Sequence, residues 1–211
     1  MDKSRQDVRI PAPDLWLRGV AIHSGLLDRA AQEAMVADLR AVAQVVPFQR
    51  MVTPSGRRMS VRMTAAGQFG WVSDRQGYRY ARTHLNGTPW PAIPPRILSV
   101  WEAVSGSTRT PECCLINFYD DQAKMGLHQD NDEADLSEPV VSISLGDSGR
   151  FRVGSETRGG TTESLWLNSG DVAVMGGAAR LIHHGVDRIK AGSSTLLPDG
   201  GRINVTLRVV T

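Results

Sequence analysis

The sequence predicts a mainly β domain of the α+β class, in which helices precede an antiparallel β core. Two observations carry this prediction. Helical periodicity occurs in two segments before residue 106, and short strand-like runs separated by turn residues follow residue 113. A third observation is the length, because 211 residues suffice to bury one hydrophobic core. We therefore expect a single domain over residues 1–211.

Two helices are expected in the first half of the chain. In the segment 26–46 apolar side chains recur at helical spacing, and Pro47 ends the pattern. Residues 1–47 would then form an N-terminal extension and a helix. A second helix should begin at Pro94 and end at Gly106. Its apolar face would consist of Ile97, Val100, Trp101 and Val104.

The segment between these helices, 48–93, shows no helical pattern, so we expect short strands and loops there. Within 50–82 seven arginines accompany a single acidic residue, Asp74. These arginines are Arg50, Arg57, Arg58, Arg62, Arg75, Arg79 and Arg82, and Phe69, Trp71, Tyr78 and Tyr80 lie among them. Guanidinium groups suit phosphates and exposed rings suit stacked bases, which favours nucleic acid as a partner. A solvated basic face in an arginine-rich chain is the alternative.

The strand-like runs of the second half favour a β-sandwich or barrel over a parallel sheet. Between two of these runs, the sequence Asn168-Ser169-Gly170-Asp171 has the composition of a hairpin turn. The predicted strands cover 113–119, 140–145, 151–153, 164–167, 171–175 and 203–210.

Composition narrows the class of protein. Apolar residues make up 41% and charged residues 22% of the chain, as in soluble globular proteins. No apolar run approaches the roughly 18–20 residues that cross a bilayer, and the first residues are charged, so we expect no signal peptide, no membrane partner and a cytoplasmic location. The only cysteines, Cys113 and Cys114, are adjacent, which argues against a disulfide scaffold or a zinc cluster.

One short motif indicates a metal site. His128 and Asp130 occupy alternate positions, so on a strand both side chains would point to the same face, and His184 follows much later in the chain. Two histidines and one carboxylate form the facial triad that binds non-haem Fe(II) and leaves positions open for a co-substrate and O2. The tripeptide alone is weak evidence, because such spacing also occurs in solvated loops. The histidines His23 and His84 are expected at the surface.

The last predicted strand carries polar side chains on one face. Its alternate positions are Arg202, Asn204, Thr206 and Arg208, and the positions between them are apolar. Two inward-facing arginines need anions, and the two carboxylates of one small dicarboxylic acid would satisfy them. An edge strand with its polar face in water is the alternative. Asn117 and Tyr119 form a similar pair, which would donate hydrogen bonds to the same acid or cap a sheet edge.

Further motifs occur in order between Phe48 and Arg208. They are Met51-Val52-Thr53-Pro54-Ser55-Gly56, Gly70-Trp71, Arg75-Gln76-Gly77-Tyr78, Pro89-Trp90-Pro91, Leu115-Ile116-Asn117-Phe118-Tyr119, Leu127-His128-Gln129-Asp130, Ser142-Ile143-Ser144-Leu145-Gly146 and His184-Gly185. With the strand that begins at Arg202, these motifs resemble the AlkB family of Fe(II)- and 2-oxoglutarate-dependent nucleic-acid dealkylases, in particular its bacterial branch.

This resemblance implies a double-stranded β-helix (jelly-roll) core, which with a helix would cover 94–211, and a nucleotide-recognition lid over 48–93. It implies Fe(II) bound by His128, Asp130 and His184, with 2-oxoglutarate and O2 as co-substrates. The implied 2-oxoglutarate contacts are Asn117, Tyr119, Arg202, Asn204, Thr206 and Arg208, with Arg202 on the distal carboxylate. The implied substrate contacts are Trp71, Tyr78, Asp132 and Arg158. Trp71 would stack on a flipped base opposite His128, and Asp132 would recognise its exocyclic amine.

The activity implied by the resemblance is oxidative demethylation of N1-methyladenine and N3-methylcytosine by a monomer, with release of formaldehyde, succinate and CO2. Single- or double-stranded DNA would be the substrate, with RNA as a further candidate, and the base must leave the stack. Two alternatives stay open: a 2-oxoglutarate oxygenase that acts on a small molecule or protein side chain, and a nucleic-acid-binding module with a vestigial iron site.

Three positions depart from the family's pattern. Asn131 replaces a lysine and Met175 replaces a tryptophan, which bears on substrate preference and local packing. His183 lies beside His184 and is the nearest competitor for the metal, but alternation would turn its side chain to the other face.

Overall fold

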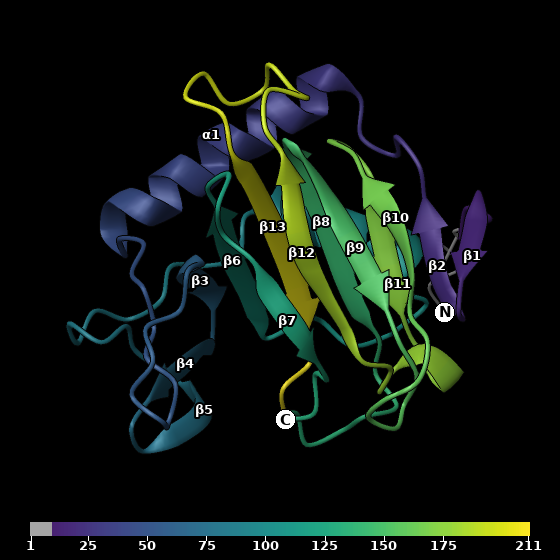
Figure 1. Ribbon diagram of the computed structural model, residues 1–211. Helices are drawn as coiled ribbons and strands as arrows, with labels where there is room; N and C mark the ends of the chain where they lie inside the picture. The colour runs from purple at the N-terminus through teal and green to yellow at the C-terminus, as the bar shows by residue number, and fades with distance from the viewer. Residues whose placement is uncertain (1–9) are drawn as a thin grey trace, which may run out of the picture.

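Two antiparallel sheets and one hairpin contain the strands of the described chain, residues 10–211, in the computed structural model (Figure 1). The strands are β1 Leu15–Leu17, β2 Val20–His23, β3 Arg62–Gly67, β4 Gly70–Asp74, β5 Gly77–Ala81, β6 Cys113–Tyr119, β7 Met125–His128, β8 Val140–Gly146, β9 Ser148–Val153, β10 Glu163–Leu167, β11 Val172–Met175, β12 His184–Lys190 and β13 Arg202–Arg208. The larger sheet has the order β1-β2-β11-β8-β13-β6-β3, the smaller sheet has the order β10-β9-β12-β7, and β4 pairs with β5.

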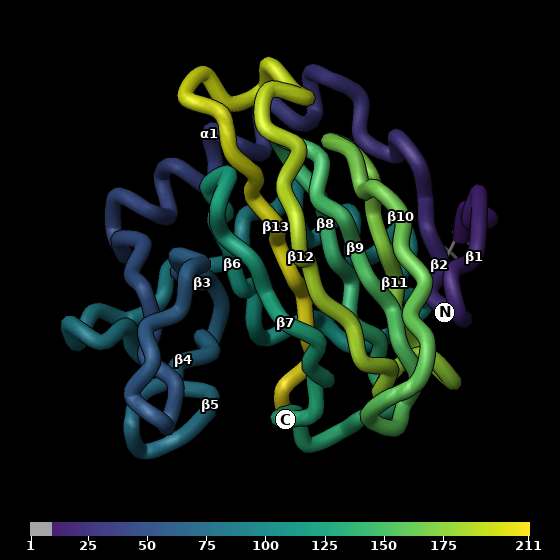
Figure 2. The backbone as a smooth tube through the Cα atoms, viewed as in Figure 1, coloured from purple at the N-terminus to yellow at the C-terminus, as the bar shows by residue number. Residues whose placement is uncertain are grey.

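The path of the chain confirms the predicted jelly roll. From β6 to β13 the strands alternate between the two sheets, except for the neighbours β9 and β10, which pair within the smaller sheet. The tube in Figure 2 follows this winding, which brings β7 and β12 together although more than fifty residues separate them in the chain. Polar side chains on the inner faces of both sheets can therefore meet in one space.

Both predicted helices form. The first, α1, covers Arg29–Val45, and the side chain of its N-cap, Asp28, accepts a hydrogen bond of 2.8 Å from the amide of Ala31. The second, α2, covers Pro95–Val104, with a proline in its first turn and Ile97, Val100, Trp101 and Val104 buried as expected. Figure 1 shows α1 passing behind the larger sheet. The buried apolar face of β13, formed by Ile203, Val205 and Leu207, points away from the polar face of that strand.

The basic segment 48–93 is divided between two places. Its strand β3 pairs with β6 along the full length of β3 and so belongs to the larger sheet. The hairpin β4–β5 lies outside that sheet, at the lower left of Figure 1. The apolar and small side chains of β3, with four consecutive buried residues from Met63 to Ala66, explain why this part joins the core.

The turn at 168–171 does not form a hairpin within one sheet, although its composition predicts one. It leads from β10 in the smaller sheet to β11 in the larger one. Gly170 has a φ of +92°, and a Cβ atom there would lie 2.6 Å from the carbonyl oxygen of Leu27. Asp171 accepts hydrogen bonds from the amides of Asn168 and Gly25 at 2.7 and 2.8 Å. The local composition therefore predicts a turn correctly. It does not predict that the strand after the turn joins the other sheet, where the turn contacts the segment before α1.

The expected surface positions of His23 and His84 are wrong, since both side chains are buried. His23 ends β2, which lies between β1 and β11, and burial lowers the pKa of its imidazole. None of the helices in residues 10–211 is long and apolar enough to span a membrane. The charged start on which the expected absence of a signal peptide rests, residues 1–9, lies outside the described residues.

Candidate active site

A cavity of about 490 Å³ lies between the two sheets and extends to the hairpin β4–β5. Every side chain that the sequence predicted for the site lines it. They are Trp71, Tyr78, Asn117, Tyr119, His128, Asp130, Asp132, Arg158, His184, Arg202, Asn204, Thr206 and Arg208. The volume is in the range of cavities that bind small ligands, which is about 300–1,000 Å³.

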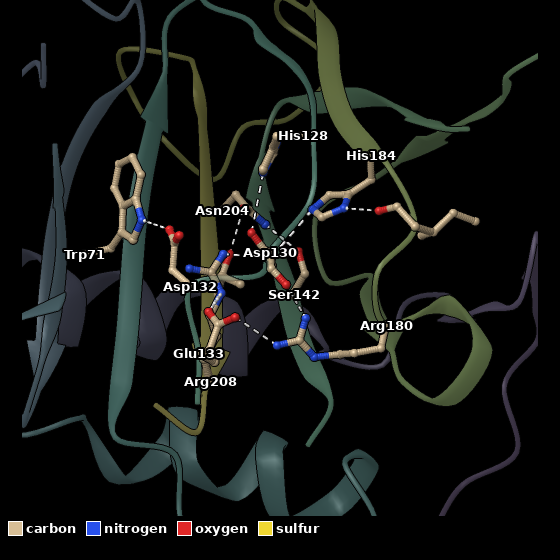
Figure 3. A network of polar contacts seen from close by, with 12 residues as sticks. Trp71, His128, Asp130, Asp132, Glu133, Ser142, Arg180, His184, Asn204 and Arg208 are labelled. Carbon is tan, nitrogen blue, oxygen red and sulfur yellow. Dashed lines mark hydrogen bonds and ion pairs between the residues drawn. The ribbon is translucent and has the colours of Figure 1, made fainter. Parts of the chain in front are cut away.

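Three of these side chains can hold one metal ion. One ligand atom each from His128, Asp130 and His184 lie within 4.8 Å of one another. The Nε2 atoms of His128 and His184 are 3.6 and 3.7 Å from the carboxylate oxygens of Asp130 (Figure 3). Two imidazoles and one carboxylate around a common position are the ligand set of the facial triad in non-haem iron sites.

The strand geometry that the sequence predicted for the tripeptide is wrong. Strand β7 ends at His128, so Asp130 lies in the loop that follows, and its carboxylate reaches the two imidazoles from there. His128 faces His184 across the β7–β12 pair. At Gly185 a Cβ atom would lie 2.6 Å from the carbonyl oxygen of Met125, so only glycine permits this close approach of the two strands.

The backbone orients both imidazoles. The Nδ1 atoms of His128 and His184 lie 3.0 and 3.1 Å from the carbonyl oxygens of Gly126 and Ile182. A carbonyl oxygen only accepts, so each Nδ1 is the donor to the backbone and each Nε2 is the ring nitrogen that faces Asp130. Burial, together with the neighbouring His128, lowers the pKa of His184 to about 4, which keeps this imidazole in the neutral form that metals bind.

Asp130 is buried but charged. Burial by itself would raise the pKa of its carboxyl, but Arg208, His184 and His128 together lower this pKa well below its ordinary value. The guanidinium of Arg208 lies 2.8 Å from the carboxylate. The ion pair and the lowered pKa both indicate an ionised ligand atom at neutral pH.

Arg202 is a fully buried cation whose hydrogen-bond partners are all uncharged oxygen atoms. Its guanidinium donates to the hydroxyl of Ser144 and to the carbonyl oxygens of Leu167 and Asp147, at 2.7, 3.2 and 3.4 Å. Its Nε atom is buried without a partner, and burial lowers the pKa of the group to about 10. A Cβ atom at Gly149 would lie 2.8 Å from that Nε, so the glycine makes room for the side chain. Such a cation suits a carboxylate ligand.

The neighbouring polar side chains complete this end of the cavity. The Oδ1 atom of Asn117 is buried without a hydrogen-bond partner, and burial raises the pKa of Tyr119 to about 12. Asn204 donates to the hydroxyl of Ser142 at 2.7 Å and accepts from Thr206 at 3.2 Å. Strand β13 lies between β8 and β6, and β6 lies between β13 and β3. The alternatives that placed these residues at a sheet edge are therefore wrong.

The hairpin β4–β5 brings two aromatic rings to the mouth of the cavity. Trp71 and Tyr78 stack with their centroids 5.4 Å apart and an interplanar angle of 18°. The indole Nε1–H of Trp71 donates to the carboxylate of Asp132 at 2.8 Å (Figure 3). One aromatic surface and one carboxylate therefore lie next to the candidate metal ligands His128, Asp130 and His184.

The sequence did not predict a buried charge network behind Asp130. Glu133 accepts from Arg180 at 2.9 Å and from the hydroxyl of Tyr80, and its carboxylate lies 3.5 Å from the Nε of Arg208. Tyr80 belongs to β5, so the network joins the hairpin to the ion pair between Arg208 and Asp130. Glu133 lies three residues after Asp130, but nothing in its local sequence separates it from the solvated acids around it.

Four of the seven arginines within 50–82 have partners in the protein. Arg50 pairs with Asp120 and Arg79 with Asp74, at 3.2 and 2.6 Å. Arg62 and Arg82 stack on the rings of Phe118 and Phe69. The other three, Arg57, Arg58 and Arg75, are exposed. Arg62 and Arg82 are exposed as well, but their guanidinium groups lie over rings, so Arg57, Arg58 and Arg75 are the exposed arginines of this segment without a side-chain partner among residues 10–211.

The positions that depart from the family's pattern leave the metal-binding group intact. His183 has its Nδ1 atom 2.9 Å from the carbonyl oxygen of Ser155 and is not part of that group. Met175 is buried at the end of β11 and lines the cavity, and Asn131 is an exposed residue on its rim.

Comparison with known proteins agrees with this geometry. Residues 19–208 match the model of the 2OG-Fe(II) oxygenase superfamily. The chain is 50% identical over 200 residues to the alpha-ketoglutarate-dependent dioxygenase AlkB homolog of Caulobacter vibrioides, which covers 94% of this chain and 88% of that protein. It is 40% identical over 201 residues to the alpha-ketoglutarate-dependent dioxygenase AlkB of Escherichia coli, with 92% and 93% covered.

The solved structure of OsALKBH1 matches with a TM-score of 0.78 and 28% sequence identity, and covers 94% of this chain and 100% of that one. The same jelly roll therefore occurs in both proteins. From the superfamily model, the bacterial relatives and the shared fold, we conclude that the chain belongs to the AlkB family of Fe(II)- and 2-oxoglutarate-dependent dioxygenases.

Proposed function

We propose that this dioxygenase removes alkyl groups from the ring nitrogens of nucleic-acid bases, with N1-methyladenine and N3-methylcytosine as its substrates. The observation that carries the proposal is the meeting of three groups in one cavity: the metal-binding side chains, a buried cation without an acidic partner, and an aromatic hairpin with a carboxylate.

His128, Asp130 and His184 are the side chains that would hold Fe(II). Arg202 would receive the distal carboxylate of 2-oxoglutarate, because its Nε is a buried donor without a partner. Asn117, Tyr119, Asn204, Thr206 and Arg208 line the same end and would hold the remaining oxygens of the acid. When bound, iron with 2-oxoglutarate and O2 supplies the oxidation that hydroxylates the N-alkyl carbon, and the acid leaves as succinate and CO2.

The protein's own residues place the base. Trp71 offers its ring face to a base that has left the stack, with His128 on the opposite side of the cavity. An N1-methyladenine or N3-methylcytosine base is cationic, so a π-face and a carboxylate both favour it. Asp132 accepts from the exocyclic amine through the oxygen that Trp71 leaves free. Tyr78 and Arg158 would contact the sugar and phosphates.

Exposed arginines of the lid would bind the rest of the strand. We assign this role to Arg57, Arg58 and Arg75, because the other arginines of the segment have partners within the protein. The lid would then consist of the hairpin β4–β5 with its flanking loops, and β3 would belong to the core. A monomeric state and a cytoplasmic location stay predictions, which size-exclusion chromatography and cell fractionation would test.

A turnover assay tests the proposal. The protein is incubated with Fe(II), ascorbate, 2-oxoglutarate and an oligonucleotide that carries one N1-methyladenine, and formaldehyde, succinate and the loss of the methyl group are measured. We expect formaldehyde in a one-to-one ratio to demethylated base. Turnover of 2-oxoglutarate without loss of the methyl group from single- or double-stranded DNA or RNA would instead support an oxygenase with another kind of substrate.

A matched variant separates catalysis from binding. His128→Ala should abolish demethylation and leave the affinity for unmodified DNA largely intact, because the exposed arginines remain. If neither His128→Ala nor a chelator changes oligonucleotide binding or any residual demethylation, the result would support the alternative of a binding module with a vestigial iron site.

A further inference from the structure

Gln129, the residue between the two ligand candidates of the tripeptide, joins two other loops. Its side-chain Nε2 group donates to the carbonyl oxygen of Glu156 at 3.0 Å and also to the carbonyl oxygen of Leu181. Glu156 lies in the loop between β9 and β10, and Leu181 lies just before β12 and His184. Both donors of a single amide are therefore used, each on a different segment.

The β9–β10 loop is held at both ends by Arg18, which donates to the carbonyl oxygen of Gly154 at 3.0 Å and to the hydroxyl of Thr161 at 3.1 Å, and between these ends by the Gln129 amide. Its first residues are held at His183, since Gly154 donates to the carbonyl oxygen of His183 at 2.8 Å and the amide of His183 donates to Ser155 at 3.0 Å. Further along, Gly159 and Gly160 have φ values of +97° and +82°, and no atom lies within 4 Å of a Cβ at either position. Such glycines leave the backbone free to adopt other conformations. Among residues 10–211, Gln129 supplies the hydrogen bond that joins 156–160 to another part of the protein.

This loop carries Arg158 to the rim of the active site. Arg158 is exposed and lines both the main cavity and a second cavity of about 210 Å³ beside it. Leu127 and His183 also line both cavities, so the two spaces adjoin. A guanidinium at this position can meet a phosphate of the strand outside the flipped base.

We propose that Gln129 is a positioning residue, which holds the Arg158 loop against the metal-binding segments and so sets the contact of Arg158 with the nucleic-acid backbone. The inference rests on the proposed function for the identity of the anion. The tripeptide 128–130 would then have two roles. Its first and third residues would bind the metal, and the side-chain amide of Gln129 between them would position the loop from which Arg158 contacts a phosphate.

The test is a double-mutant cycle between Gln129 and Arg158. Gln129→Met keeps the length of the side chain and removes both donors, and Gln129→Glu keeps its shape and replaces the donors by acceptors. Each is combined with Arg158→Ala, and the KM and kcat for a methylated oligonucleotide are measured together with the affinity for the unmodified oligonucleotide by fluorescence anisotropy. Gln122→Met, at an exposed glutamine in the loop after β6, is the matched control.

We expect Gln129→Met and Gln129→Glu to raise KM and Kd about fivefold to tenfold, the effect of removing one or two hydrogen bonds, with a smaller change in kcat. In the Arg158→Ala background neither substitution should weaken binding further, because the residue through which Gln129 acts is absent. Gln122→Met should change neither constant.

Two results would overturn the inference. One is an unchanged KM and Kd in both Gln129 variants. The other is a weakening of binding that persists in full after Arg158→Ala, since Gln129 would then act through the ligand segments alone. Failure of the proposed function can be distinguished from failure of this inference, because the anisotropy measurement needs no turnover. A wild-type protein that binds DNA without demethylating it would refute the proposed function. The affinities of the Gln129 and Arg158 variants would still test the inference.

Discussion

The indole N–H of Trp71 donates a hydrogen bond of 2.8 Å to Asp132 and so joins strand β4 to the loop that carries Asp130 (Figure 3). Trp71 therefore has two separable tasks. Its ring face can stack on a base, and its N–H occupies one carboxylate oxygen of Asp132 and leaves the other to face the cavity.

Trp71→Phe separates these tasks, because phenylalanine keeps a ring and lacks the N–H. We expect the preference for N1-methyladenine over N3-methylthymine to fall about fivefold to tenfold, since an Asp132 that the indole no longer orients is less well placed to accept from an exocyclic amine. The measurement is kcat/KM on oligonucleotides that carry either lesion. Trp71→Ala lacks both the ring and the N–H, so the preference should fall as in Trp71→Phe, and kcat/KM should fall by a further tenfold or so for both substrates, because stacking is worth about 1–3 kcal/mol per base. An unchanged preference in Trp71→Phe would contradict the role of the N–H.

Arg202 should couple 2-oxoglutarate binding to stability. In the wild type we expect 2-oxoglutarate with Mn(II) to raise Tm, because the ligand binds the folded state alone. Arg202→Met should abolish this shift and change the free energy of unfolding of the free protein by less than about 2 kcal/mol, since removal of a buried cation offsets the missing hydrogen bonds. The control is Arg188→Met at an exposed position of β12, which should keep the full shift. A shift retained in Arg202→Met would place the acid elsewhere.

Glu133 should be essential for stability, because it neutralises Arg180 and lies beside Arg208 in the interior. Glu133→Gln leaves the buried Arg180 without its acid, while Arg208 keeps Asp130, and we expect the free energy of unfolding to fall by about 3–5 kcal/mol in urea titrations. Tyr80→Phe removes only the hydroxyl that donates to the same carboxylate and should cost about 1 kcal/mol. Equal effects of the two substitutions would show that the charge of Glu133 is unimportant.

The exposed arginines of the lid should account for the salt dependence of binding. For Arg57→Gln and Arg58→Gln, we expect weaker binding to all sequences, and the slope of log K against log salt should become shallower by about one for each phosphate that the variant no longer binds. Arg79→Gln is the matched control, because Asp74 already holds that guanidinium at 2.6 Å. A slope that responds to Arg79 and not to Arg57 or Arg58 would place the DNA on another face.

Asp187 gives a pH dependence with a definite sign. The pKa of Asp187 is lowered mainly by the hydrogen bond from Arg150. Partial burial opposes this shift, and the charges of Arg150 and Arg152 add to it. A carboxyl whose pKa is lower in the folded state than in the unfolded state stabilises the folded state. This contribution is fully present at pH values above the pKa of the unfolded state, about 4, and is lost as the pH falls through the pKa of the folded state. We expect Asp187→Asn to be less stable than the wild type by about 1 kcal/mol or less at pH 7, with a smaller difference below about pH 4. Urea titrations at both pH values measure this difference, and a difference that grows as the pH falls would contradict the assignment.

Several features of this protein follow from its sequence alone. The periodicity of α1 and α2 and the alternation of Arg202, Asn204, Thr206 and Arg208 are local patterns, and local patterns dictate which side chains share a face. The spacing of His128, Asp130 and His184 indicated a metal site because few residue types bind iron. The family resemblance then predicted the jelly roll, which the structure confirms, and the substrate contacts, which stay predictions.

The tertiary structure alone decided the rest. It placed Asp130 beyond the end of β7, led the turn at 168–171 from one sheet to the other, and buried Glu133 against Arg180. It also set Gln129 between two loops that are remote in the chain. Each of these features depends on contacts between segments far apart in sequence, and no short pattern within one segment specifies which partner the fold will bring to it.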